Sequence, residues 1–421
     1  MPLSRPRRAA RPALPARRSR YVLPSGLWAL ALTVCSVPAA SAGDAEPSPA
    51  ASAPTVRLPV IPGSLGSGAS CTRPSPTAMT VVPWTYAVLG LSGAREHSRG
   101  AGVTVAVVDT GVEPGTRGLK GRVEAVGDAG EDCVGHGSFV AGLIAADDRT
   151  SGGAGAGGMA PDARVLAVRG TDARGRADAA AVAVGIRAAA DARAGVIAVP
   201  LALSKSSEDL TAAVRYATAQ DCLVVAAAVP DAPAGASHGT TTPAPPGAYW
   251  PASDKGVLSV LDFGPDGDRP DDAPKPLRAD LAAPGDKVVG AGPRGKGSFT
   301  GTGASFATAY VAGAAALVRS RYPKLSAEET ARRLTGTAYP ADTPRLDTYA
   351  SLTVVPHTGR AAVSQGAPER RVVLSLRADD PGPRRIALLV GSAGLLAVLT
   401  AAAVRGAVRA RRVRPDDVAE A

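Results

Sequence analysis

Three residues of this sequence have the types that nucleophilic catalysis requires: Asp109, His136 and Ser305. A serine hydroxyl is a weak nucleophile until a histidine accepts its proton. An aspartate beside the histidine fixes the tautomer of the imidazole and stabilises its charged form. Together, the three residue types could carry out acyl transfer through a serine nucleophile.

The local sequence around each residue favours a functional position. Asp109 ends an apolar run and is followed by Thr110-Gly111, while His136 lies between glycines just before a helical stretch. Ser305 precedes a run of small residues typical of a helix, so its amide and the helix dipole would lie where an oxyanion forms. Singly, each has an ordinary interpretation as a strand exit, a lone histidine or a helix N-cap. Their order and contexts together favour catalysis.

Short apolar runs alternate with longer helical stretches between residues 103 and 352. The runs are VTVAVVDTG, ARVLAVRG, GVIAVPLAL, CLVVAAAV and GVLSVLDF, and the predicted helices are Phe139–Ala146, Ala177–Ala194, Ser206–Gln220, Phe306–Arg321 and Ala327–Thr337. Continuous apolar strands separated by helices indicate a parallel sheet covered on both faces. The sequence therefore predicts an α/β fold with Asp109 at the carboxyl edge of the sheet, where ligands meet such folds.

These segments resemble the subtilisin-like (S8) serine peptidases, and among them the mycosins, membrane-anchored proteases associated with type VII secretion. The similar segments are AGVTVAVVDTGV, DCVGHGSFVAG, GMAPDARVLAV, DLAAPG and SFATAYVAGAAALV, and the resemblance runs from about Pro83 to the C-terminal tail. The order aspartate, histidine, serine is that of subtilisin. The resemblance implies a seven-stranded parallel sheet, endopeptidase activity through Asp109, His136 and Ser305, and no cofactor.

The sequence departs from the family pattern at several positions. Ala304 replaces the usual threonine before the serine, Ala309 replaces a usual proline, and the substrate-pairing segment reads Pro200-Leu201-Ala202. The resemblance places the family's oxyanion asparagine at Pro230, which has neither an amide hydrogen nor a side-chain donor. The departures therefore predict a degenerate oxyanion position and reduced activity.

Both ends of the chain carry targeting patterns. Residues 1–42 combine seven arginines, a short apolar run and an Ala-Ser-Ala site, the pattern of a cleaved signal peptide. Residues 386–404 are uncharged and long enough for a transmembrane helix. Five arginines follow this span and two precede it, which predicts a cytoplasmic tail at residues 405–421.

The remaining boundaries follow from these two ends. We expect an N-terminal extension at residues 43–98, a peptidase domain at 99–355 and a linker at 356–385, all on the outer side of the cell membrane. The net charge of +10 comes mostly from the signal and the tail, and about +1 remains for the exported part. This is too little for the basic surface of a nucleic-acid binder.

Three cysteines remain after signal removal: Cys71, Cys133 and Cys222. No CxxC pair or Cys/His cluster is present, so no metal site is expected. An exported protein can keep a disulfide, and three cysteines allow one pair and one thiol. Cys222 opens an apolar run and is expected to be the buried thiol, which predicts a Cys71–Cys133 disulfide.

Two functional hypotheses follow. The first is an active endopeptidase that cuts an exported protein or peptide. The second is a catalytically impaired scaffold with the same fold that stabilises a membrane secretion complex. The degenerate oxyanion position favours the scaffold and the three catalytic residue types favour the enzyme. A third class, a membrane adhesion or sensor protein, would not need all three catalytic residues.

Overall fold

The computed structural model describes residues 56–79, 81–147, 157–231, 246–269, 273–355 and 382–411. Contacts between residues divide the chain into two units, Met1–Leu58 and Pro59–Ala421, and residues 56–58 are the described part of the first. The predicted signal peptide lies outside the described residues. So do residues 43–55 of the extension, 356–381 of the linker and 412–421 of the tail.

A parallel sheet of seven strands forms the centre of the described domain, in the order β2-β3-β1-β4-β5-β6-β7. The strands are β1 (Thr104–Asp109), β2 (Val123–Ala125), β3 (Arg164–Arg169), β4 (Val196–Val199), β5 (Leu223–Ala227), β6 (Val257–Phe263) and β7 (Leu281–Pro284). The inner strands β4, β5 and β6 are buried along their whole length, as expected for strands covered on both faces. The predicted α/β fold is confirmed.

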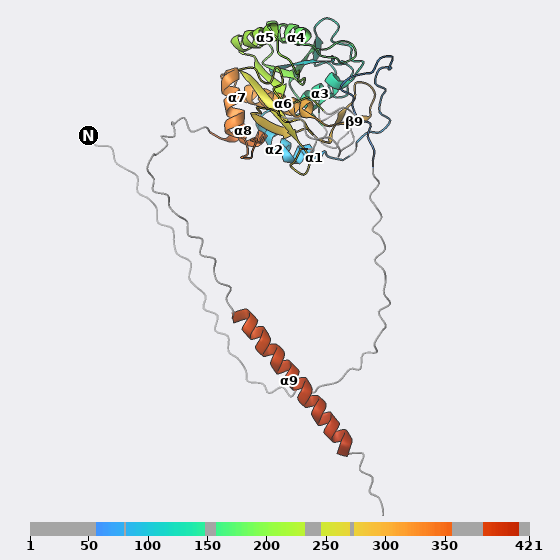
Figure 1. The fold of residues 1–421 in the computed structure, drawn as a ribbon, viewed down its shortest axis with the longest axis vertical. Coiled ribbons are helices and arrows are strands. Elements are labelled where there is room, and N and C mark those ends of the chain that lie inside the picture. Colours follow the sequence, from blue (N-terminus) through green and yellow to red (C-terminus); the bar gives the residue numbers. More distant parts are fainter. Residues whose placement is uncertain are drawn as a thin grey trace, which may run out of the picture. The chain divides into compact units, whose positions relative to one another are not determined.

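Helices cover both faces of the sheet (Figure 1). They are α3 (His136–Ala145), α4 (Ala179–Asp191), α5 (Glu208–Ala219), α6 (Ala304–Arg321) and α7 (Ala327–Gly336). Alternate residues of β1 divide between the two cores. Val105 and Val107 pack with residues of α3 and α6, whereas Ala106 and Val108 pack with α4 and α5. The period of two in a strand thus sends one set of side chains to each layer.

Helix α6 is buried along most of its length, from Ala304 to Val318. Its sequence is rich in alanine, so its backbone can approach the sheet and the neighbouring helices closely. At Gly313 even a single added carbon would lie 2.5 Å from the Cβ of Met159. Because a buried helix needs no polar face, its composition fits this central place and holds Ser305 at a rigid helix start.

Several short elements were not predicted from the sequence. They are α1 (Trp84–Val88), α2 (Leu91–His97), α8 (Thr348–Thr353) and the strands β2, β7, β8 (Val288–Ala291) and β9 (Ser298–Gly301). Elements of three to seven residues contain too little of a helical or strand period to be recognised by pattern. The buried Leu89, Leu91 and Ala94 join α1 and α2 to the main core, so this part of the extension belongs to the domain.

Residues 59–79 of the N-terminal extension lie against the domain as irregular chain. Strands β8 and β9 form an antiparallel pair, and the amide of Ile61 donates to the carbonyl of Thr300 on β9 at 2.9 Å. Further along, the Ser298 amide donates to the carbonyl of Thr77 at 2.7 Å. The extension thus pairs with backbone groups of β9 that its partner strand β8 leaves unpaired.

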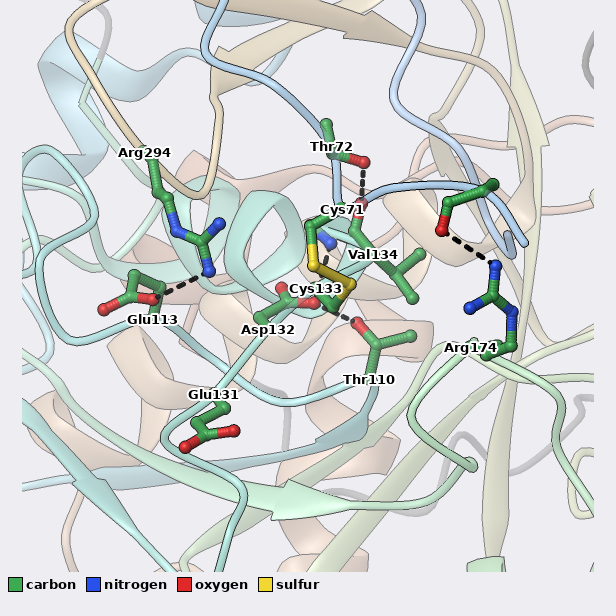
Figure 2. Close-up of a disulfide and its surroundings, with 12 residues drawn as sticks. Cys71, Thr72, Thr110, Glu113, Glu131, Asp132, Cys133, Val134, Arg174 and Arg294 are labelled. Atoms are coloured by element: carbon green, nitrogen blue, oxygen red, sulfur yellow. Dashed lines mark hydrogen bonds and ion pairs between the residues drawn. A yellow bond between two sulfur atoms is a disulfide. The ribbon is translucent and has the colours of Figure 1, made fainter. Parts of the chain in front are cut away.

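A disulfide fixes the middle of the extension (Figure 2). Cys71 and Cys133 are bonded across 62 residues of sequence, as predicted. The amide of Thr72 donates to the Cys133 carbonyl at 2.9 Å, and its hydroxyl donates to the Val134 carbonyl at 2.5 Å. Within the described part of the chain, Cys222 is a free thiol, and it is buried. Burial raises the pKa of this thiol to about 11, which keeps it protonated and unreactive.

The C-terminal region contains a long helix, α9 (Gly382–Arg411). Among the described residues it is the one helix with a segment, Leu389–Arg409, that is long and apolar enough to cross a membrane. The helix extends beyond both ends of the predicted span at residues 386–404. It includes part of the predicted linker and the first arginines of the predicted tail.

We predict that removing the disulfide destabilises the domain. In the chain-entropy treatment, a crosslink that closes a loop of 62 residues stabilises the folded state by about 4 kcal/mol. The Cys71→Ser, Cys133→Ser double variant should lose about this much free energy of unfolding, measured by chemical denaturation of the full chain in detergent micelles. A thiol reductant should bring the wild type to the same stability and leave the double variant unchanged. Peptide mapping that finds both thiols free, or either one paired with Cys222, would show the assignment to be wrong.

Candidate active site

Asp109 lies at the carboxyl end of β1, an inner strand of the sheet between β3 and β4, and its side chain is fully buried. One carboxylate oxygen accepts a hydrogen bond from the Thr110 amide at 2.7 Å. The other lies 2.7 Å from Nδ1 of His136. The two bonds orient the carboxylate and satisfy it in a place that water does not reach.

His136 is the first residue of α3, and its ring is buried. Gly135 precedes it with φ of 93°, a left-handed conformation that glycine adopts at little cost and that turns the chain into the helix. Nε2 of the imidazole lies 3.2 Å from Oγ of Ser305. The ring also packs against Phe306, with 5.3 Å between ring centroids. His136 therefore bridges β1 and α6.

Ser305 is the second residue of α6 and is buried at its start. Gly303, with φ of 150°, leads into the helix. The structure thus brings together Asp109, His136 and Ser305, which the sequence placed 27 and 169 residues apart. Their hydrogen bonds form a chain from carboxylate to imidazole to hydroxyl, the geometry needed to activate a serine.

A buried carboxylate that the sequence did not single out shapes the loop before α3. One oxygen of Asp132 accepts from the Thr110 hydroxyl at 2.9 Å and the Gly135 amide at 2.7 Å. The other accepts from both the amide and the hydroxyl of Ser138, at 2.9 and 2.7 Å. Figure 2 shows Asp132 beside the disulfide, with its contact to Thr110. Asp132 therefore positions the turn that carries His136.

The residue after Pro230, Asp231, contacts Ser305. The prediction placed the replaced asparagine at Pro230, but the side chain that reaches the site is that of Asp231. Its Oδ1 accepts from the Ser305 amide at 3.1 Å, and its Oδ2 accepts from the Ser305 hydroxyl at 2.5 Å. Oδ2 also lies 3.7 Å from Nε2 of His136. The carboxylate of Asp231 thus lies beside both the amide and the hydroxyl of Ser305.

The charges around His136 change its protonation. Burial by itself would lower the pKa of the imidazole. The carboxylates of Asp109 and Asp231 outweigh burial and raise the pKa of His136 to about 10. The two carboxylates therefore favour the charged form of the imidazole in this arrangement. It can then donate hydrogen bonds from both nitrogens, but it cannot accept the Ser305 proton.

The described residues contain no group of three or more His, Cys, Asp or Glu side chains that could hold a metal ion. The side chains of the site offer a carboxylate, an imidazole, a hydroxyl and the second carboxylate of Asp231. These groups suit proton transfer and nucleophilic attack on a carbonyl carbon.

Comparison with known proteins agrees with this fold. The pattern of the Subtilase family matches residues 100–367. Mycosin-3 of Mycobacterium tuberculosis is 32% identical over 404 residues, which cover 78% of this chain and 84% of that protein. Subtilisin DY of Bacillus licheniformis is 33% identical over 245 residues, covering 57% of this chain and 85% of that protein.

The structural comparison points the same way. The structure of the MycP3 protease from the type VII (ESX-3) secretion system aligns with a TM-score of 0.58 and 32% identity, covering 72% of this chain and 99% of that one. The chain belongs to the subtilase family. It is a subtilisin-like serine protease related to the mycosins of type VII secretion.

We predict that Asp132 is needed for the stability of the loop before α3. Asp132→Ala would leave several buried N–H and O–H donors without an acceptor, at a cost of 1–3 kcal/mol each, less where the loop relaxes. The free energy of unfolding should fall by about 3 kcal/mol in chemical denaturation of the full chain. Glu131→Ala, a change at the exposed neighbouring carboxylate, should stay within about 0.5 kcal/mol of the wild type. Equal effects of the two substitutions would contradict the proposed role of Asp132.

Proposed function

We propose that this chain is a membrane-anchored, extracytoplasmic serine endopeptidase with Asp109, His136 and Ser305 as its catalytic triad. The observation that carries the proposal is the hydrogen-bonded chain from Asp109 Oδ2 to His136 Nδ1 at 2.7 Å and from His136 Nε2 to Ser305 Oγ at 3.2 Å. Membership of the subtilase family supports the same reaction class.

The roles follow from the geometry. Oγ of Ser305 attacks the carbonyl carbon of the peptide bond, and its proton passes to Nε2 of His136. Asp109 stabilises the resulting imidazolium through Nδ1. The proton then goes to the leaving amine, and water hydrolyses the acyl-enzyme by the same route in reverse. The Ser305 amide, at the start of α6, would donate to the oxyanion, where the positive end of the helix dipole also helps.

We propose that the activity is attenuated. Most of the transition-state stabilisation in such sites comes from donors aimed at the oxyanion, and losing one costs about a hundred- to a thousandfold in turnover. Here the ionised carboxylate of Asp231 stands beside the Ser305 amide. It can only accept hydrogen bonds, and it competes with the substrate oxygen for the remaining donor.

A second candidate function is a catalytically impaired scaffold that keeps the fold and stabilises a membrane secretion complex. The observation that favours it is again Asp231, whose Oδ2 accepts from the Ser305 hydroxyl at 2.5 Å and so competes with His136 for that proton. The two candidates differ in one measurable property, the reactivity of Ser305.

The domain boundaries and the anchoring are part of the proposal. A signal peptide at residues 1–42, an extension at 43–98, a peptidase domain at 99–355, a linker at 356–385, a membrane span at 386–404 and a cytoplasmic tail at 405–421 would place the site outside the cell. The apolar segment Leu389–Arg409 of α9 supports the anchor. The similarity to mycosins supports a protein or peptide substrate and a place in a secretion-system complex.

We predict that a fluorophosphonate probe labels the full chain at Ser305. The probe reacts with serines that a neighbouring base activates, so Ser305→Ala should abolish the label. Ser320→Ala, which changes another serine of α6 whose hydroxyl donates to the Ala101 carbonyl, should leave labelling unchanged. Labelling that persists in Ser305→Ala would overturn the triad. A fully folded wild type that never reacts would favour the scaffold.

We also predict the orientation of the chain in the membrane. The arginine excess after the span should keep the C-terminus inside the cell. A fluorescent reporter that matures only in the cytoplasm should therefore be active when fused after Ala421, and inactive in a truncated chain fused after Val355. A reporter after Ala421 that works only outside the cytoplasm would contradict this orientation.

A further inference from the structure

Asp231 lies in the reaction space rather than beside it. It follows the buried strand β5 by four residues, and its carboxylate reaches both the amide and the hydroxyl of Ser305. The side chain is 23% exposed. Opposite it, an added carbon on Gly303 would lie 1.9 Å from Oδ1 of Asp231, so only glycine leaves room for this carboxylate.

The hydrogen bonds around Ser305 define where the protons lie in this arrangement. The Ser305 hydroxyl donates to Asp231, so its bond with Nε2 of His136 needs a proton on Nε2. Nδ1 bears the other proton and donates to Asp109. The imidazole is then an imidazolium, in agreement with a pKa of His136 raised above its usual value by the two carboxylates. The resting site is fully hydrogen-bonded but has no free base.

The charged and titratable groups that face Asp231 come from three elements. His136 approaches it from α3 and Ser305 from α6. The charge of Asp231 also acts on Asp262, which lies on β6. Asp262 is buried and paired with Arg269, with 2.9 Å between Nη2 of Arg269 and Oδ1 of Asp262. The Asp109 carboxylate lies on the far side of the His136 ring. Two carboxylates therefore share one imidazolium, and moving one proton removes one positive and one negative charge.

We propose that Asp231, in its carboxylic acid form, is the second hydrogen-bond donor to the oxyanion, and that its proton comes from His136 through the Ser305 hydroxyl. This inference rests on the proposed endopeptidase function. The relay is a double transfer: the proton on Nε2 moves to Oγ while the proton on Oγ moves to Oδ2 of Asp231. It leaves a neutral imidazole and a carboxylic acid, the two forms that the reaction needs.

In the acylation and deacylation steps, Asp231 acts only as a hydrogen-bond donor. The substrate oxygen replaces Oδ1 of Asp231 at the Ser305 amide and accepts from the O–H of Asp231. The bond from Oγ to the carbonyl carbon forms as the Oγ proton passes to His136, and the carbon–nitrogen bond breaks as that proton passes to the amine. Water then adds to the acyl group with His136 as base, and the bond to Oγ breaks. Asp231 keeps its proton throughout.

The reactive and resting forms contain the same number of protons. Removing one proton takes the donor from Asp231, so the rate should fall at alkaline pH. The pKa of about 10 for His136 marks the loss of the shared proton and thus the alkaline fall. With asparagine at position 231 the donor is permanent. His136 then only has to be neutral, and the rate should rise once with pH and stay high.

The experiment measures the second-order rate of fluorophosphonate labelling of the full chain in detergent micelles, from pH 5 to 11. The phosphoryl oxygen of this probe enters the same site during attack, so it reports on the donor. For the wild type we expect a rate that falls as the pH rises through about 10. For Asp231→Asn we expect a rate about a hundred- to a thousandfold higher at pH 7 and no alkaline fall.

Three further variants complete the test. Asp231→Ala, which removes the carboxylate without adding a donor, should show a single rising limb but react about a hundredfold more slowly than Asp231→Asn. Asp254→Asn removes a carboxylate that bonds to Thr211 on α5, and should follow the wild type. Ser305→Ala should not react. NMR of the wild type with labelled histidine gives an independent readout: the His136 imidazole should stay charged to near pH 10.

The outcomes separate this inference from the proposed function. A wild-type profile with one rising limb, an Asp231→Asn variant no faster than the wild type, or a His136 ring neutral at pH 7 would overturn the role of Asp231 and leave the triad intact. The same holds if only the Asp231 variants react, because Asp231 would then merely block the site. If none of the folded chains reacts at any pH, the proposed endopeptidase function itself fails.

Discussion

The hydrogen bond between His136 and Asp109 constrains the rest of the site, because the Asp109 carboxylate is buried at the end of the inner strand β1. A buried charge is tolerated only when it is paired and hydrogen-bonded. α3 must therefore approach the turn after β1 so closely that an added carbon on Gly137 would meet the Gly111 carbonyl oxygen at 2.1 Å. The glycines around His136 leave room for this close approach, and the hydrogen bonds of Asp132 hold the turn in place.

Much of the fold could be predicted from the sequence, because β1, β4 and β5 are continuous apolar runs and the longer helices have clear patterns. The contact of Asp109, His136 and Ser305 is the geometry that their order and local contexts suggested. Asp132 could not be recognised, since an aspartate with four buried donors looks the same in sequence as a solvated one. Its place before Gly-His-Gly was the one available signal. The short helices and strands could not be recognised either, because each contains less than a full helical or strand pattern.

The oxyanion region illustrates a different limit. The sequence indicates that the asparagine is missing, but not which side chain takes its place. Pro230 was the aligned residue, whereas the backbone after β5 directs Asp231 towards Ser305. Pro230 has an inert ring, whereas the next residue, Asp231, has an acidic side chain. Whether this chain is a slow enzyme or a scaffold depends on that acid, because the other groups of the site already have the geometry of a serine peptidase.

The disulfide between Cys71 and Cys133 also bears on when the site is completed relative to export of the chain. Cys133 is three residues from His136, so this bond completes the anchoring of the segment that carries the base. Disulfides form in oxidising compartments and are rare in the reducing cytoplasm. In a chain exported as proposed, the histidine loop would reach its final constraint only after crossing the membrane. The protease would thus mature on the side where its substrates are, and the proteins of the cell that makes it would be spared.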